Sequence, residues 1–173
     1  MIAVSDTGPL LYLSLIHRTE LLSHVFERVL IPQSVTAELS DPSTPPQASA
    51  LIVRKPDWLY ICTVLGIDPS LQRLGPGEQE AITLALSAPA DVLLTDDAAA
   101  RRTATHVCKI AATGTIGVLY AAATDQRTLF TATDFDDAID QLRRTNFYIS
   151  RALQQSIEGM SRRLHAGGRP ETL

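Results

Sequence analysis

Short apolar runs end abruptly at polar or turn-forming residues at several points along the chain. Such runs occupy positions 2–5, 28–31, 58–64, 92–95 and 107–112. Their length and their content of β-branched residues predict strands. The run at 92–95 is apolar at consecutive positions, a pattern typical of a strand that is covered on both faces of a parallel sheet.

Between these runs, apolar residues recur at the three- and four-residue spacing of amphipathic helices. The segments are 10–16, 21–26, 33–39, 47–54, 78–88, 116–124, 134–143 and 149–164. We expect Thr19 to cap the second of them, and Ile82, Ala85 and Leu86 to form the buried stripe of 78–88. Strands that alternate with helices predict an α/β fold with a mainly parallel sheet wrapped by helices.

Length and composition indicate one domain. The chain has 173 residues, of which 45% are hydrophobic, enough for a core of ordinary size. We expect the domain to span 1–165 and residues 166–173 to form a disordered tail. The absence of a long apolar stretch or a signal sequence predicts a cytoplasmic protein with no membrane span. Cys62 and Cys108 lie in apolar runs, without partners at metal-binding spacing, and are interpreted as core residues.

The net charge of −4 excludes a protein that attracts nucleic acid over its whole surface. Any contact with nucleic acid must therefore be local. Arg101 and Arg102 follow the acidic pair Asp96-Asp97 by about one helical turn and are the first candidates for such a contact. The alternative is a helix face on which these arginines form ordinary salt bridges.

Acidic residues stand where predicted strands end or helices begin. Asp6 follows the first strand, Asp96 and Asp97 follow the strand at 92–95, and Glu78 opens a helix after Gly75-Pro76-Gly77. Glu38 comes from the helix that follows the second strand. In a parallel sheet, the carboxyl ends of the strands and the starts of the next helices form the usual ligand crevice. We therefore expect these acids to converge.

Converging carboxylates need a cation, because each raises the pKa of its neighbours. Oxygen ligands without histidine or cysteine suit Mg²⁺ or Mn²⁺ rather than zinc. Such an ion can orient a water for attack on a phosphodiester and stabilise the charge that develops. Each acid also has a simpler alternative role: Asp6, Asp96 or Asp97 as a helix cap, and Glu78 as a favourable charge at a helix start.

With these residues identified, the sequence resembles the PIN-domain family of metal-dependent ribonucleases, which includes many toxins of toxin-antitoxin pairs. Four segments are similar to the acidic motifs of the family: 4–10, 31–39, 75–82 and 93–97. The resemblance as a whole extends from Ile2 to about Leu164, which is essentially the whole domain. The subgroup with a Gly-Glu-x-Glu-Ala-Ile motif, here at 77–82, is the most similar, together with the segments 113–119 and 147–150.

The resemblance implies a three-layer fold with a sheet of about five parallel strands, and cleavage of single-stranded RNA with Mg²⁺ or Mn²⁺. It assigns the catalytic positions to Asp6, Glu38, Glu78 and Asp97. Asp6, Glu78, Asp97 and also Asp96 would hold the metal, and Thr95, Arg101 and Arg102 would contact the substrate or the attacking water. Two registers stay open, because Glu80 competes with Glu78 and Asp96 competes with Asp97.

The same resemblance implies a cognate antitoxin protein and a homodimer. Apolar residues of the helices within 10–26 could supply the dimer face, although core packing explains them equally well. The alternative to an enzyme is a catalytically silent PIN-like domain that binds RNA or protein. The complete acidic set favours the enzyme.

Overall fold

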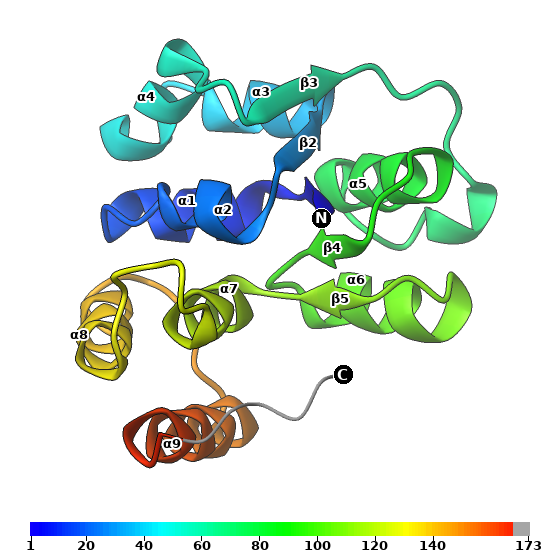
Figure 1. Cartoon of the computed structure of the whole chain (residues 1–173). Coiled ribbons are helices and arrows are strands. Elements are labelled where there is room, and N and C mark those ends of the chain that lie inside the picture. The colour runs from blue at the N-terminus through cyan, green and yellow to red at the C-terminus, as the bar shows by residue number, and fades with distance from the viewer. Residues whose placement is uncertain (168–173) are drawn as a thin grey trace.

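The computed structural model describes residues 1–167 and contains a five-stranded sheet (Figure 1). The strands are β1 (Ile2–Ser5), β2 (Arg28–Pro32), β3 (Leu59–Cys62), β4 (Val92–Leu94) and β5 (Ala112–Thr113). Their order is β3-β2-β1-β4-β5, and every neighbouring pair is parallel. The α/β fold with about five parallel strands is thereby confirmed.

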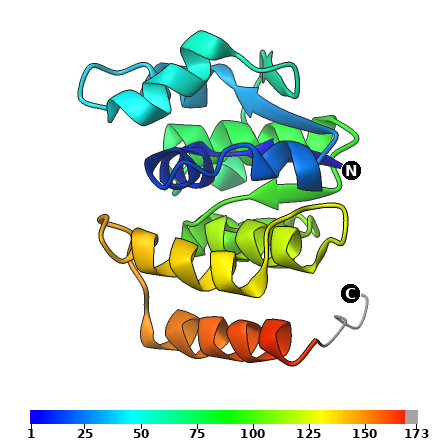
Figure 2. The ribbon, with the colours of Figure 1, turned by 60° about the vertical axis from the view of Figure 1, so that its left-hand side comes forward.

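Helices connect and cover these strands. In chain order they are α1 (Thr7–Leu15), α2 (Leu21–Val25), α3 (Gln33–Leu39), α4 (Pro46–Arg54), the 3-10 turn η1 (Pro69–Leu71), α5 (Pro76–Ser87), α6 (Ala98–Arg102), the π-helical turn η2 (Thr103–Val107), α7 (Thr115–Thr124), α8 (Ala132–Leu142) and α9 (Arg151–His165). Figure 2 shows α8 and α9 side by side at the β5 end of the molecule.

The sheet separates two hydrophobic cores, which makes the fold three-layered. Helices α5 and α6 lie on one face, and α1, α2, α4, α7 and α8 lie on the other (Figure 1). Neighbouring residues of one strand enter different cores: Ala3 packs on the side of α1, and Val4 packs on the side of α5. Successive strand side chains point to opposite faces, so a strand covered on both faces needs apolar residues at consecutive positions.

The chain reverses its direction of travel across the sheet at β1. It proceeds from β1 outward to β2 and β3, and then returns to place β4 and β5 on the other side of β1. Such a reversal leaves a crevice beyond the carboxyl ends of the two strands at the switch, here β1 and β4. The backbone N–H of Asp6 donates to the carbonyl of Leu94 at 3.0 Å and joins these two strand ends.

The prediction of a strand at 107–112 is wrong for all of these residues except Ala112. Helix α6 continues into η2, and the N–H of Cys108 donates to the carbonyl of Thr103 at 3.0 Å, a five-residue closure. Lys109 then adopts a positive φ of 58° and turns the chain toward the sheet. Strand β5 begins only at Ala112. An apolar run alone does not distinguish a strand from a buried helical turn.

Two details of the predicted helices are also wrong. Thr19 does not cap α2: the capping position is Glu20, without a side-chain hydrogen bond. In α5, Ile82 and Ala85 are buried as expected, but Leu86 is half exposed, and Ala81 and Leu84 complete the buried face instead. The 3.6-residue repeat places Leu84, not Leu86, on the side of the sheet.

The two cysteines lie beside the core, as expected from the sequence. Cys62 and Cys108 are partly buried against the α5-side core. Residues 168–173 of the expected tail lie outside the described residues. In the described chain, no helix combines the length and the apolar character needed to cross a membrane.

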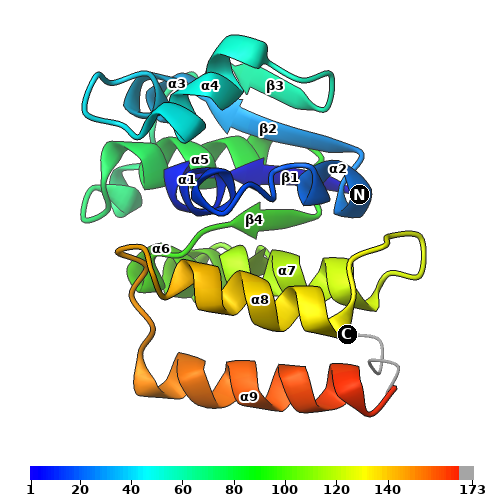
Figure 3. The same cartoon turned by 90° about the vertical axis from the view of Figure 1, so that its left-hand side faces the viewer.

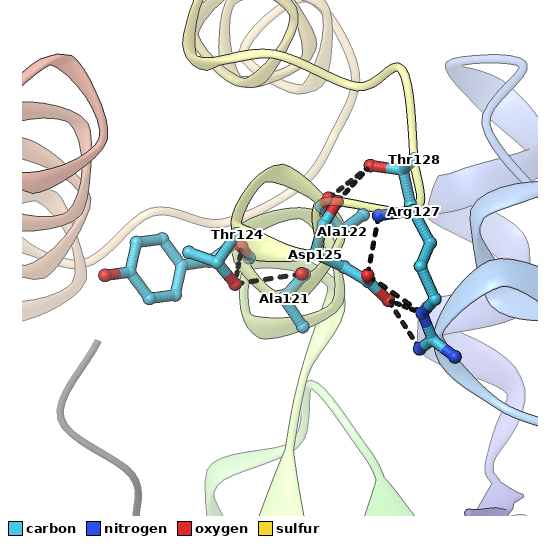
Figure 4. Close-up of polar contacts among 7 residues, drawn as sticks. Ala121, Ala122, Thr124, Asp125, Arg127 and Thr128 are labelled. Carbon is cyan, nitrogen blue, oxygen red and sulfur yellow. Dashed lines mark hydrogen bonds and ion pairs between the residues drawn. The ribbon is translucent and has the colours of Figure 1, made fainter. Parts of the chain in front are cut away.

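Hydrogen bonds and an ion pair stabilise the C-terminal end of α7 (Figure 4). The hydroxyl of Thr124 donates to the carbonyl of Ala121 at 2.9 Å, and Asp125 pairs with Arg127 at 2.6 Å. A helix of ten residues is about 15 Å long, so these contacts are remote from the start of α7, where β5 ends.

Candidate active site

A small cavity lies beyond the carboxyl ends of β1 and β4. Its volume is about 90 Å³, and it is lined by Asp6, Thr7, Gly8, Glu38, Gly77, Glu78, Asp96 and Asp97. All five acidic residues expected at a metal site therefore border one cavity. They come from the ends of two strands and from α3 and α5, because the switch in strand order gathers these elements.

Asp6 is the most enclosed of these acids, with 6% of its surface exposed. Its Oδ1 accepts the N–H of Gly8 at 3.1 Å and caps α1. The pKa of Asp6 is raised to about 7, chiefly by burial and also by the negative charges of Asp96 and Glu78, while hydrogen bonds from Thr95 and Gly8 act in the opposite direction. A carboxyl in this state favours either a proton or a cation.

Asp96 is held by both of its oxygens. The N–H of Thr115 donates to Oδ1 at 2.8 Å, and the hydroxyl of Thr115 donates to Oδ2 at 2.5 Å. Burial raises the pKa of Asp96, while the bonds from Thr115 and the charge of Arg101 oppose that rise. Asp96 therefore has a fixed orientation beside Asp6.

Asp97 is more exposed than Asp96 and acts as the cap of α6. Its Oδ1 accepts the N–H of Ala100 at 2.7 Å, and its own N–H donates to the hydroxyl of Thr95 at 3.2 Å. Capping occupies one carboxylate oxygen, so capping and cation binding are compatible roles for this side chain.

Glu78 and Glu80 have separate surroundings. Glu78 lines the cavity, and its carboxylate lies against Gly75, where a side chain would overlap with it. Glu80 lies away from the lining, and its Oε2 accepts the N–H of Ser34 at 3.1 Å, in the first turn of α3. An acid at that point satisfies a free N–H and the positive end of the helix dipole. This position gives Glu80 a structural role.

Glu38 reaches the cavity from the last turn of α3. The hydroxyl of Thr7 donates to its Oε2, and a Cβ at Gly77 would lie only 3.0 Å from its Oε1. Glycine at position 77 therefore leaves the space that the Glu38 carboxylate occupies.

The three residues expected to contact the substrate lie in different places. Thr95 is fully buried and bonds to the cavity acids. Arg101 donates from Nη2 to the carbonyl of Thr95 at 2.7 Å and lies beside Asp96. Arg102 is exposed on α6 and lines neither this cavity nor the larger one next to it.

Thr115 and Gly114 contribute to the site without having been predicted there. A Cβ at Gly114 would overlap with Oδ1 of Asp96 and Nη2 of Arg101, so only glycine permits this close approach. The Thr113-Gly114-Thr115 segment was the available signal, but by itself it indicates only a turn. The hydrogen bond between Thr115 and Asp96 joins residues that are 19 positions apart, so no local pattern in the sequence indicates it.

The donor set fits a hard divalent cation. The lining offers carboxylate oxygens and no histidine or cysteine, and the cavity has room for an ion with several waters. Within residues 1–167, however, no group of three such side chains is already arranged around a single point. Asp97 is turned toward Ala100 and Glu38 toward Thr7. Rotation of these two exposed side chains would bring further oxygens to the cavity.

Comparison with known proteins identifies the fold family. No curated protein and no solved structure matches the chain significantly. A family model described as a PIN domain matches residues 2–160, which include every element from β1 to most of α9. PIN domains generally are nucleases and use divalent metals. This match covers far more than half of the chain, which therefore belongs to the PIN-domain family.

Proposed function

We propose that the protein is an endoribonuclease that cleaves single-stranded RNA with Mg²⁺ or Mn²⁺. The observation that carries the proposal is the convergence of Asp6, Glu78 and Asp96 on one cavity, where burial, together with the negative charges of Asp96 and Glu78, raises the pKa of Asp6 to about 7. A site with this much unbalanced negative charge is stabilised by a cation.

Asp6, Glu78 and Asp96 would hold the ion, directly or through water, and Asp97 would join them by rotation of its side chain. When bound, a divalent cation supplies a polarised water and a counter-charge for the phosphate. Thr115 keeps Asp96 oriented through its two hydrogen bonds. Glu38 is exposed and accepts a hydrogen bond from Thr7, and it would accept a proton from the attacking water.

The sequence left open two choices between nearby acids, and we make a specific proposal for each. Glu78 is preferred to Glu80, because Glu80 is engaged with the start of α3. Asp96 is placed ahead of Asp97, because the charge of Asp96, not that of Asp97, contributes to the raised pKa of Asp6. Both aspartates stay in the proposed site, Asp97 as a catalytic acid and metal ligand and Asp96 as a metal ligand.

We also propose that the protein is the toxin of a toxin-antitoxin pair, which implies an antitoxin that blocks the cavity. A homodimer is proposed as well, but not through the apolar residues of α1 and α2. Those side chains, among them Leu10, Leu13 and Leu22, are buried in the protein's own core.

The test is cleavage of a mixed pool of single-stranded RNA by the full chain. We expect cleavage with Mg²⁺ or Mn²⁺, none with a chelator, and loss of cleavage in Asp6→Asn and Asp97→Asn. Cleavage that persists in both variants would contradict the assigned site. No cleavage with any divalent ion would favour a catalytically silent domain that binds RNA or protein.

A further inference from the structure

A second cavity, of about 390 Å³, adjoins the acidic one, and Asp96 lines both. It lies between α1, the start of α7 and the segment that leads into α9. In Figure 3 the strands point to the left, and the linker between α8 and α9 runs on that same side. The second cavity is large enough for one unit of a polymer that also reaches the acids.

Three aromatic rings contribute to this cavity: Tyr12, Phe147 and Tyr148. Tyr12 and Phe147 pack edge to face, with ring centroids 4.7 Å apart, which fixes both rings. Tyr148 follows Phe147 directly and is 82% exposed, although large aromatic side chains usually bury most of their surface. An exposed ring beside fixed rings is a surface on which a flat ligand can stack.

A positive charge lies in the second cavity beside Asp96, the residue that lines both cavities. Arg101 lines the second cavity and lies against Gly114 and Asp96. Its Nη2 is bonded to Thr95, while its Nε has no hydrogen-bond partner among the residues described. A guanidinium attracts phosphate and base oxygens, whereas the acids alone would repel a nucleic acid.

From these contacts we propose that the second cavity binds a nucleobase of the single-stranded RNA whose neighbouring phosphate lies at the acidic cavity. This inference rests on the proposed function and adds the residues that grip the substrate. The base stacks on Tyr148, and Arg101 lies between the base and the phosphate. Such stacking tolerates any base, because every base has a flat face.

The proposal predicts a loss of RNA affinity in Tyr148→Ala. Base stacking on one aromatic residue contributes enough for about a tenfold rise in Kd and KM, with kcat little changed. Tyr148→Phe should keep wild-type values. Tyr60→Ala is the matched control, because Tyr60 is an exposed tyrosine at 44% on β3, the opposite edge of the sheet. Both positions are exposed, so neither change threatens folding.

The decisive measurement is fluorescence anisotropy of a labelled single-stranded RNA in the presence of a chelator, which prevents metal-dependent cleavage. The same RNA with single abasic sites is compared in wild type and Tyr148→Ala. One abasic position should weaken wild-type binding about tenfold and leave the variant unaffected, since the two changes remove one interaction. Equal affinities of Tyr148→Ala and Tyr60→Ala, or equal abasic effects in both proteins, would overturn the proposal.

The two proposals fail in different ways. A wild-type protein that cleaves RNA but is insensitive to Tyr148→Ala overturns the base-binding cavity alone. A protein that shows the abasic effect but never cleaves supports the cavity and contradicts the nuclease.

Discussion

Thr115 donates two hydrogen bonds to the carboxylate of Asp96, from its N–H at 2.8 Å and from its hydroxyl at 2.5 Å. The pair joins the start of α7 to the end of β4, so the orientation of one acid depends on a residue far along the chain. Asp96 in turn lies beside Asp6, whose pKa it raises. This relationship makes Thr115 the residue whose removal should disturb the site without touching an acid.

Thr115→Val removes one donor and keeps the shape of the side chain. We expect kcat for RNA cleavage to fall about 10- to 100-fold, the usual cost of losing a partner that orients a metal ligand. Thr124→Val is the control, because it removes a hydroxyl at the other end of the same helix. If both variants lose activity equally, Thr115 contributes only to stability.

Gly114→Ala tests the close approach between α7 and Asp96. The added Cβ would overlap with Asp96 and Arg101 and would lie 3.0 Å from the carbonyl of Thr95. We expect the free energy of unfolding to fall by about 1–3 kcal/mol, together with cleavage activity.

The matched control for Gly114→Ala is Gly159→Ala in α9. The nearest atom to its new Cβ is Nη1 of Arg163, at 3.7 Å. This variant should gain about 0.5–1 kcal/mol, because alanine favours a helix over glycine. Urea unfolding measures both effects, and equal changes in the two variants would contradict the steric explanation.

Glu78→Gln and Glu80→Gln separate the two candidate glutamates of α5. Loss of the charge at Glu78, which lines the cavity, should weaken Mn²⁺ binding and abolish cleavage. Glu80→Gln should retain cleavage, because the amide oxygen can still accept the N–H of Ser34. Loss of activity in Glu80→Gln with activity retained in Glu78→Gln would reverse the assignment.

These positions also show how far the sequence alone could lead. The convergence of four acids is predictable from the sequence, because they stand at strand ends and a helix start and the order of elements brings such positions together: Asp6, Glu78, Asp96 and Asp97. The sequence alone does not show which glutamate, Glu78 or Glu80, lines the cavity. The answer depends on a tertiary contact, because Glu80 reaches the start of α3 while Glu78 lines the cavity.

The region after α6 was the least predictable part of the fold. The apolar run at 107–110 has the composition of a strand. In the structure, however, it lies where the helical segment ends, with Val107 as the last residue of η2 and Lys109 at a positive φ. From the sequence, Tyr12 is only one residue of the amphipathic helix expected at 10–16. Its place on the wall of the second cavity depends on contact with Phe147, across most of the chain length.

The raised pKa of Asp6 predicts how stability of the metal-free protein varies with pH. The pKa is 3.8 ordinarily and about 7 in the fold, so the folded state binds the proton more tightly than the unfolded state. The stabilising effect is present below about pH 4 and is lost as the pH rises through about 7. Asp96, with its pKa also raised, adds an effect of the same sign, and Glu78 faces Asp6 from α5.

Asp6→Asn should therefore be more stable than wild type at about pH 8 by a few kcal/mol, at roughly 1.4 kcal/mol for each unit of pKa shift. Near pH 5 the difference should be much smaller. Urea unfolding of both proteins with a chelator measures it. Parallel stability curves across this pH range would show that Asp6 keeps an ordinary pKa.

Calorimetric titration of Mn²⁺ into the full chain at about pH 7 tests the central claim most directly. With a pKa of about 7, Asp6 is partly protonated at this pH, and a cation at the acidic cavity must displace that proton. We predict saturable binding by the wild type with proton release, seen as a dependence of the heat on the buffer. In Asp6→Asn, binding should be greatly weakened and the proton release lost. Equal Mn²⁺ affinity in both proteins, or no binding by the wild type, would contradict a metal site at this cavity.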